Sequence, residues 1–141
     1  MARDRDGVLW FYQGTGNPDR PFKARVSLGG GWNQYTSLTA FPNGILARDA
    51  AGVLWIYDAS IANVGGPLDP RRKYGTGFGS FTALAFGGAK TGAGHADLVA
   101  RDRAGNLWLY EGMTNVRDDR KTLTGKRTLI SGAWNVYTLL I

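Results

Sequence analysis

The hydrophobic and polar positions of this chain follow a pattern that returns three times. Each copy begins with the polar segment Ala-Arg-Asp, turns at a glycine, and continues into a short aromatic and aliphatic run that ends in Tyr. Such runs, when an Asp-x-x-Gly turn precedes them, predict β-strands joined as hairpins. The copies cover residues 2–12, 47–57 and 100–110.

A second repeated signature lies between these copies. The segment Gly-Trp-Asn-Gln-Tyr-Thr at residues 31–36 corresponds to residues 77–82 and 133–138. Each signature opens a nearly continuous apolar or Thr-rich run, which predicts a strand that is buried on both faces. The runs cover residues 35–41, 81–86 and 137–141.

The spacing of the repeats predicts the architecture. The first signature recurs after 45 and then 53 residues, and a period near 45 residues with four strands is the size of one β-propeller blade. For the blade that begins at residue 35, we expect the first three strands, from the ring channel outward, at residues 35–41, 45–49 and 53–57. The fourth, outermost strands of the neighbouring blades are expected at residues 23–28 and 127–130. The predicted fold is all-β, with three circularly offset blade equivalents: residues 1–34 with 137–141, residues 35–80, and residues 81–136.

Three blades are too few for a closed ring, because propellers have about four to eight. The first blade lacks its innermost strand, and residues 137–141 form an innermost strand without partners of its own. We therefore expect a homodimer that closes a six-bladed ring, with residues 137–141 of one copy beside residues 2–4 of the other. The alternative is that the chain is a fragment of a longer array.

Composition narrows the chemistry that the chain can perform. Its 141 residues carry a net charge of +6, with no cysteine and one histidine, His95. Zero cysteine excludes a disulfide scaffold and a thiolate site, and a single histidine argues against a catalytic dyad or a multi-histidine zinc site. Since no acid–base or nucleophile set and no phosphate-binding loop is evident either, we expect a protein that is not an enzyme.

The repeats resemble a known family. The run from Phe86-Gly87-Gly88 to Ala-Asp-Leu-Val-Ala-Arg-Asp at 96–102 resembles the FG-GAP/VCBS-type repeat, which builds integrin alpha-chain propellers and many secreted bacterial propellers. With Gly-x-Leu-Trp-x-Tyr and Gly-Trp-Asn-x-Tyr-Thr, it looks like the version often appended to actinobacterial secreted hydrolases. The resemblance covers essentially the whole chain. It implies a secreted or extracellular location, although residues 1–6 carry no apolar signal segment.

The resemblance also bears on cofactors. Members of the family often bind calcium through aspartates in the turn between the first and second strands of a blade, and calcium needs several carboxylate ligands. In this chain the matching positions hold Ala89 and Ala93, and only Asp97 remains. We therefore expect that the calcium site is lost and that the chain needs no cofactor, with His95 as a solvated turn residue.

Strand alternation places the Arg-Asp turns on the same ring face as the Gly-Trp-Asn links. An aromatic plane beside an amide and an Arg/Asp pair suits a sugar, because the ring covers C–H faces while polar groups bind hydroxyls. Propeller lectins that resemble this architecture bind sugars between adjacent blades, so we predict a multivalent, lectin-like carbohydrate-binding module. The candidate ligand-binding residues are Trp32, Asn33, Tyr35, Arg48, Asp49, Arg101, Asp102, Trp134, Asn135 and Tyr137.

Other interpretations stay open. The Arg-Asp pairs could simply brace turns, with Trp10, Trp55 and Trp108 packing between blades. The chain could be a structural or engineered propeller fragment that self-assembles without a specific ligand. The basic links at 70–73 and 117–127 could bind a protein or an anionic polymer, although aspartates interleave there. No nucleic-acid motif and no apolar run of about 18 residues is present, so we expect neither nucleic acid nor membrane as a partner.

Overall fold

The computed structural model describes residues 1–41, 44–58, 68–87, 96–113, 127–138 and 140. These residues form three antiparallel sheets in chain order, with short 3₁₀ helices in the links between them. The first sheet consists of Ala2–Arg3 (β1), Leu9–Phe11 (β2) and Val26–Ser27 (β3). The second consists of Tyr35–Phe41 (β4), Gly44–Asp49 (β5), Leu54–Asp58 (β6) and Arg72–Gly75 (β7), and the third of Phe81–Phe86 (β8), Ala96–Asp102 (β9), Leu107–Met113 (β10) and Arg127–Ser131 (β11).

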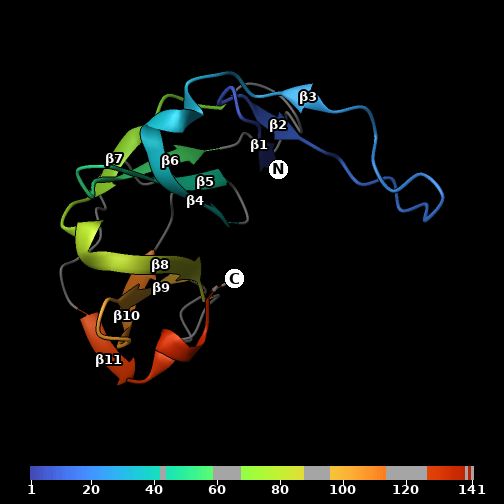
Figure 1. Cartoon of the computed structure of the whole chain (residues 1–141). Coiled ribbons are helices and arrows are strands. Elements are labelled where there is room, and N and C mark those ends of the chain that lie inside the picture. The colour runs from blue at the N-terminus through green and yellow to red at the C-terminus, as the bar shows by residue number, and fades with distance from the viewer. Residues whose placement is uncertain (42–43, 59–67, 88–95, 114–126, 139, 141) are drawn as a thin grey trace.

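Each sheet is a meander in which consecutive strands pair. In the second sheet Tyr35 lies opposite Asp49 and Leu38 opposite Ala47, and the third sheet repeats this register with Phe81 opposite Asp102. The sheets follow one another around an arc, with β4 and β8 toward its concave side and β7 and β11 farther out (Figure 1). The three described sheets leave one side of the arc open (Figure 1).

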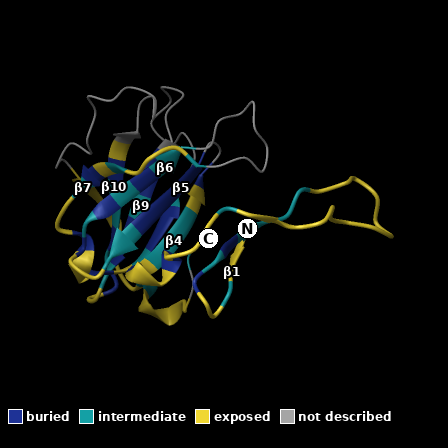
Figure 2. Cartoon of the chain, turned by 90° about the horizontal axis from the view of Figure 1, so that it is seen from above, coloured by how far each residue is buried: buried dark blue, intermediate teal, exposed yellow. Residues whose placement is uncertain are grey.

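The hydrophobic core lies between neighbouring sheets, and β5 shows why. Ile45 and Ala47 belong to the cluster shared with Leu9 of the first sheet, whereas Leu46 belongs to the cluster shared with Leu98 of the third. Successive side chains of a strand point to opposite faces, so a strand between two sheets must be apolar at every position. Figure 2 shows this burial along β5 and β9.

The link between β2 and β3 is an extended arm over residues 12–25. It projects away from the sheets in both views (Figures 1 and 2). An isolated bridge joins Gly14 to Phe22, and Phe22 packs edge-on against Tyr12.

The all-β class is confirmed, and most strands lie where the sequence predicts them. Two differ. The outermost strand of the first sheet is limited to Val26–Ser27 rather than residues 23–28, because it pairs with only two residues of β2, Trp10 and Phe11. Residues 137, 138 and 140 are not in a strand, since a strand needs a neighbour for its backbone groups.

Candidate binding site

Each sheet carries a carboxylate that binds a tryptophan of the same sheet. In the second sheet, Asp49 at the end of β5 accepts a hydrogen bond at Oδ2 from Trp55 Nε1 (2.8 Å) and one at Oδ1 from the backbone N–H of Val53 (2.9 Å). These bonds favour the charged form and lower the pKa of Asp49. The guanidinium of Arg71 covers the Trp55 ring at 4.2 Å from its centroid. The matching sets are Asp4, Trp10 and Arg25, and Asp102, Trp108 and Arg127.

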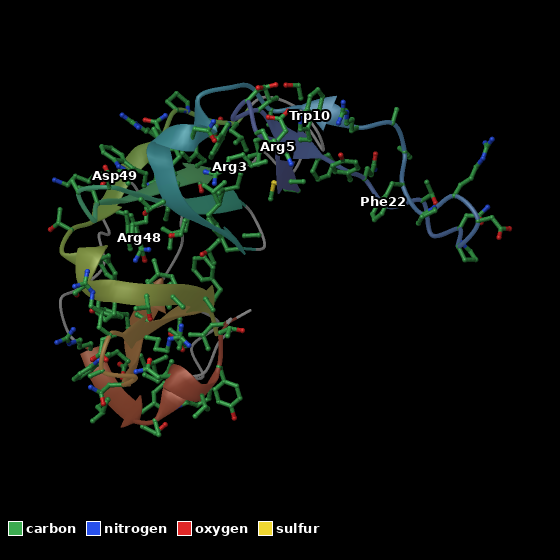
Figure 3. All side chains as sticks on the ribbon, viewed as in Figure 1. Arg3, Arg5, Trp10, Phe22, Arg48 and Asp49 are labelled. Atoms are coloured by element: carbon green, nitrogen blue, oxygen red, sulfur yellow. The ribbon has the colours of Figure 1, made fainter. Side chains whose placement is uncertain are left out.

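The arginine before each of these aspartates binds the link that follows its sheet along the chain, and Arg3 and Arg48 thereby join two sheets. Arg48 Nη1 donates to the carbonyls of Phe78 (3.1 Å) and Phe81, where the chain enters the third sheet. Its Nε donates to Thr36 Oγ1 of its own sheet at 3.3 Å. Figure 3 shows Arg48 at the boundary between the second and third sheets, and Arg3 in the same role one sheet earlier. Arg3 binds the carbonyls of Trp32 and Tyr35, and Arg101 those of Trp134 and Tyr137.

The asparagine of each Gly-Trp-Asn signature also binds backbone. Asn33 Nδ2 donates to the carbonyl of Arg5 at 3.1 Å, while the N–H of Trp32 donates to the carbonyl of Gly7 at 3.0 Å. Both bonds dock the 3₁₀ helix Trp32–Gln34 onto the turn of the preceding sheet. Asn135 makes the matching bond to the carbonyl of Arg103. These turns and links are therefore in direct contact.

The aromatic residues of the signature pack against one another. Trp32 is 4% exposed, and its ring centroid lies 4.6 Å from that of Tyr57 and 5.8 Å from that of Tyr35. Burial raises the pKa of Tyr57 to about 12, so its phenol is neutral at physiological pH. Phe78, Phe81 and Tyr110 form the matching group one sheet later. Trp134 contacts Tyr137 at 5.4 Å.

A hollow of about 520 Å³ lies beside the first of these aromatic groups, between the first and second sheets. We call it the seam hollow. One wall is the link with its three consecutive glycines, Gly29–Gly31, whose backbone has no side chains to cover it. The lining residues are Ser27, Leu28, Gly29, Gly30, Gly31, Trp32, Gln34, Tyr57, Leu68, Asp69 and Pro70.

Of the ten candidate residues, the structure places only Trp32 in the lining of the seam hollow. The polar groups of Asn33, Arg48, Asp49, Arg101, Asp102 and Asn135 bind partners within the chain, and Tyr35 and Tyr137 pack in aromatic groups. Tyr57, Gln34 and Asp69 line the hollow and were not among the residues predicted from the sequence. Tyr57 ends the repeated aromatic run, where no binding role was predicted, and the glycine run at 29–31 was the available signal for a wall with open backbone.

Two arginines of the first basic link, residues 70–73, bind partners within the chain. Arg71 Nη1 donates to Tyr35 Oη (2.7 Å) and to Gln34 Oε1 (3.1 Å), and Arg72 forms an ion pair with Asp58 at 2.8 Å. The second basic link lies outside the described residues except for Arg127, which covers Trp108. Of the positions discussed for calcium, Ala89, Ala93 and His95 also lie outside the described residues, and Asp97 is buried in β9.

Comparison with family models, curated proteins and solved structures found no match for this chain. Within the described part of the chain, no helix has the length and apolar character needed to cross a membrane.

Proposed function

We propose that this chain is a non-catalytic carbohydrate-binding module and that its ligand occupies the seam hollow. The observation that carries the proposal is the composition of that hollow. It combines the aromatic rings of Trp32 and Tyr57 with short polar groups and open glycine backbone. An apolar wall beside a few convergent polar groups is what a sugar requires, with its C–H faces and its hydroxyls.

The volume and charge of the hollow agree with such a ligand. A hollow of about 520 Å³ lies within the range of roughly 300–1,000 Å³ that small-molecule sites occupy. Asp69 is exposed at its edge and can accept hydrogen bonds from hydroxyl groups. The guanidinium of Arg71 already binds Tyr35 and Gln34 and covers Trp55, which favours a neutral polyhydroxylated ligand over an anionic polymer.

The architecture belongs to the same proposal. Successive antiparallel meanders that pack face to face around an arc support blades of an FG-GAP/VCBS-type propeller. The chain supplies three of these sheets, and two copies would make a six-bladed ring with repeated seams. A ring of this kind would carry one seam hollow per chain, and two weak sites on one rigid ring gain affinity for an extracellular glycan that presents several sugars.

Two substitutions test the ligand site. A glycan array followed by calorimetric titration should identify a sugar that the 141-residue chain binds. Gly30→Leu should abolish this binding, because a Cβ at Gly30 meets nothing within 4 Å and the added side chain can occupy the hollow. Asp69→Ala should weaken binding about tenfold, the loss expected when a charged acceptor is removed.

Matched controls are Thr76→Leu, at the position of Gly30 in the next link, and Asp19→Ala on the arm. Both should bind as the parent chain does. The proposal fails if no glycan binds, or if Gly30→Leu and Asp69→Ala bind normally. Binding that weakens steeply with salt and with Arg71→Ala would instead identify an anionic polymer as ligand.

A further inference from the structure

The outer side of the third sheet and the link after it expose residues whose counterparts at the seams within the chain are buried or half-buried. Tyr137 is 55% exposed, whereas the matching Tyr35 and Phe81 are 2% and 4% exposed. Ile130 is 48% exposed, whereas the matching Tyr74 is 5% exposed. We call this surface, formed by Ile130, Trp134 and Tyr137, the tail face.

The aromatic group of the tail face has two rings where the others have three. Trp32 and Tyr35, at the start of the second sheet, pack with Tyr57 of that sheet. Phe78 and Phe81, at the start of the third sheet, pack with Tyr110 in the same way. Trp134 contacts Tyr137, and the counterpart of Tyr57 for this pair would come from a following sheet. In the repeat, the residue that corresponds to Tyr57 and Tyr110 is Tyr12, which lies at the other end of the arc.

The first sheet carries the complementary features, which we call the head face: β1, Arg3 and Tyr12. The strand β1 pairs with β2, and no other strand among the described residues pairs with its second edge. The strands in the same position, β5 and β9, each pair on both edges.

The side chain of Arg3 also differs from its counterparts, Arg48 and Arg101, in its surroundings. Arg101 donates through Nε to Thr82 Oγ1 at 3.0 Å, and Thr82 Oγ1 donates to the Arg101 carbonyl at 3.2 Å. Arg48 and Thr36 form the same pair. The threonine at this position for Arg3 is Thr138, which is exposed on the tail side, and Arg3 is exposed while Arg101 is buried.

We propose that the tail face of one copy of this chain docks on the head face of a second copy, and that two such seams close the ring. The chain at Tyr137, Thr138 and Leu140 adds to β1 in the register of the other sheets, with Tyr137 opposite Asp4 and Leu140 opposite Ala2, as Tyr35 is opposite Asp49 and Leu38 opposite Ala47. Tyr12 completes the aromatic group of Trp134 and Tyr137, and Thr138 binds Arg3.

The partner of the tail face is a second copy of this chain, because each copy carries the complementary head face at the other end of the arc. Such head-to-tail contacts close into a ring when the rotation permits. Two copies give six sheets, within the usual four to eight blades, whereas three copies give nine. This inference rests on the propeller arrangement proposed above and is independent of the glycan, since the seam hollow lies within one chain.

Light scattering on the 141-residue chain at micromolar concentration should give about twice its 15.3 kDa mass. Tyr137→Glu on the tail face and Tyr12→Glu on the head face should each give monomers. In a dimer of either variant, each of the two seams between the copies would contain a buried glutamate. Arg103→Glu, at an exposed turn position, should leave the parent mass unchanged. Circular dichroism establishes that each variant is folded.

Mixing the two monomeric variants tests the head-to-tail arrangement. An equimolar mixture contains one intact head and one intact tail, so a two-chain species should reappear. The proposal is overturned if the parent chain is a monomer or a trimer, if either variant alone stays dimeric, or if the mixture does not associate. A monomeric parent chain that binds glycan would overturn the head-to-tail dimer and support the ligand site. A dimer that binds no glycan would support the dimer and overturn the ligand site.

Discussion

At the scale of single residues, the repeated aspartates act as internal hydrogen-bond acceptors. Each carboxylate binds an indole N–H at 2.8 Å and the backbone N–H four residues later, so it closes its own turn and fixes the tryptophan beside it. Both partners favour the ionised carboxylate. The stability of the fold is therefore linked to pH through these residues.

Asp102 gives the clearest pH prediction. The hydrogen bond from Trp108 is the largest of the causes that lower the pKa of Asp102 to about 2. A carboxyl whose folded pKa lies below its unfolded value, about 4, stabilises the fold above that value and loses this contribution as pH falls through the folded pKa. The free energy of unfolding, measured with urea, should therefore fall between about pH 4 and pH 2.

The variant Asp102→Asn should show a smaller fall over the same pH range, because its amide does not titrate. Asp19→Asn on the exposed arm is the control and should follow the parent curve. Parallel curves for the parent chain and Asp102→Asn would contradict this account of the carboxylate.

The same residues show what the sequence could reveal about the site. Repetition of Arg-Asp and Trp-Asn indicates that these positions matter, but a repeated ligand site and a repeated structural bond produce the same pattern. The partners of Arg48 and Asn33 include backbone carbonyls. Every residue has a backbone carbonyl, so the sequence does not indicate which one a side chain will bind. Asp69 and Gln34 were missed for the opposite reason, since they line the hollow without repeating.

At the scale of elements, the Asp-x-x-Gly turn and the 3₁₀ helix that it contacts form the joint between sheets. Gly52 has φ +75°, and a Cβ there would lie 2.3 Å from the backbone nitrogen of Gly79. Gly77 has a similar φ of +84°, but a Cβ there meets nothing within 4 Å. The two glycines therefore separate the effect of close approach from that of backbone conformation.

Gly77→Ala should cost about 1 kcal/mol of unfolding free energy, the strain of a left-handed alanine. The chain already carries Ala133, with φ 67°, at the corresponding position of the next link. Gly52→Ala should cost about 2–5 kcal/mol, because the methyl group also forces the turn and the helix apart. Urea unfolding of both variants measures the difference, and equal losses would show that the joint is not closely packed.

The strands themselves were predictable where their cause is local. The runs at residues 35–41 and 81–86 form strands as predicted, but they are not buried on both faces, because Thr36, Ala40 and Thr82 are exposed. The turn glycines mark the start of the strands that follow them. Residues 137–141 carry the same apolar pattern, but the pattern becomes a strand only beside a neighbour. Pairing is a non-local property, so the sequence predicts the potential strand and the assembly determines whether it forms.

At the scale of the whole molecule, the arc behaves as a series of equivalent seams. Each internal seam contains one group of packed aromatic rings, one arginine bound to backbone carbonyls and one docked 3₁₀ helix, and stability in such arrays is approximately a sum over units and interfaces. An unpaired seam at each end of the arc leaves apolar residues exposed. Association of two copies therefore adds interfaces of a kind that already holds the chain together.

This seam predicts that thermal stability depends on protein concentration. When the folded species is a dimer and the unfolded species is a monomer, mass action favours folding by about 1.4 kcal/mol of dimer for each tenfold rise in concentration. With an unfolding entropy of about 2.1 cal/mol/K per residue, two chains of 141 residues should gain roughly 2 °C in Tm per tenfold. Differential scanning calorimetry between micromolar and millimolar concentration measures this slope. Tyr137→Glu should have a lower Tm that does not change with concentration, and a flat slope for the parent chain would show that the seam stays open.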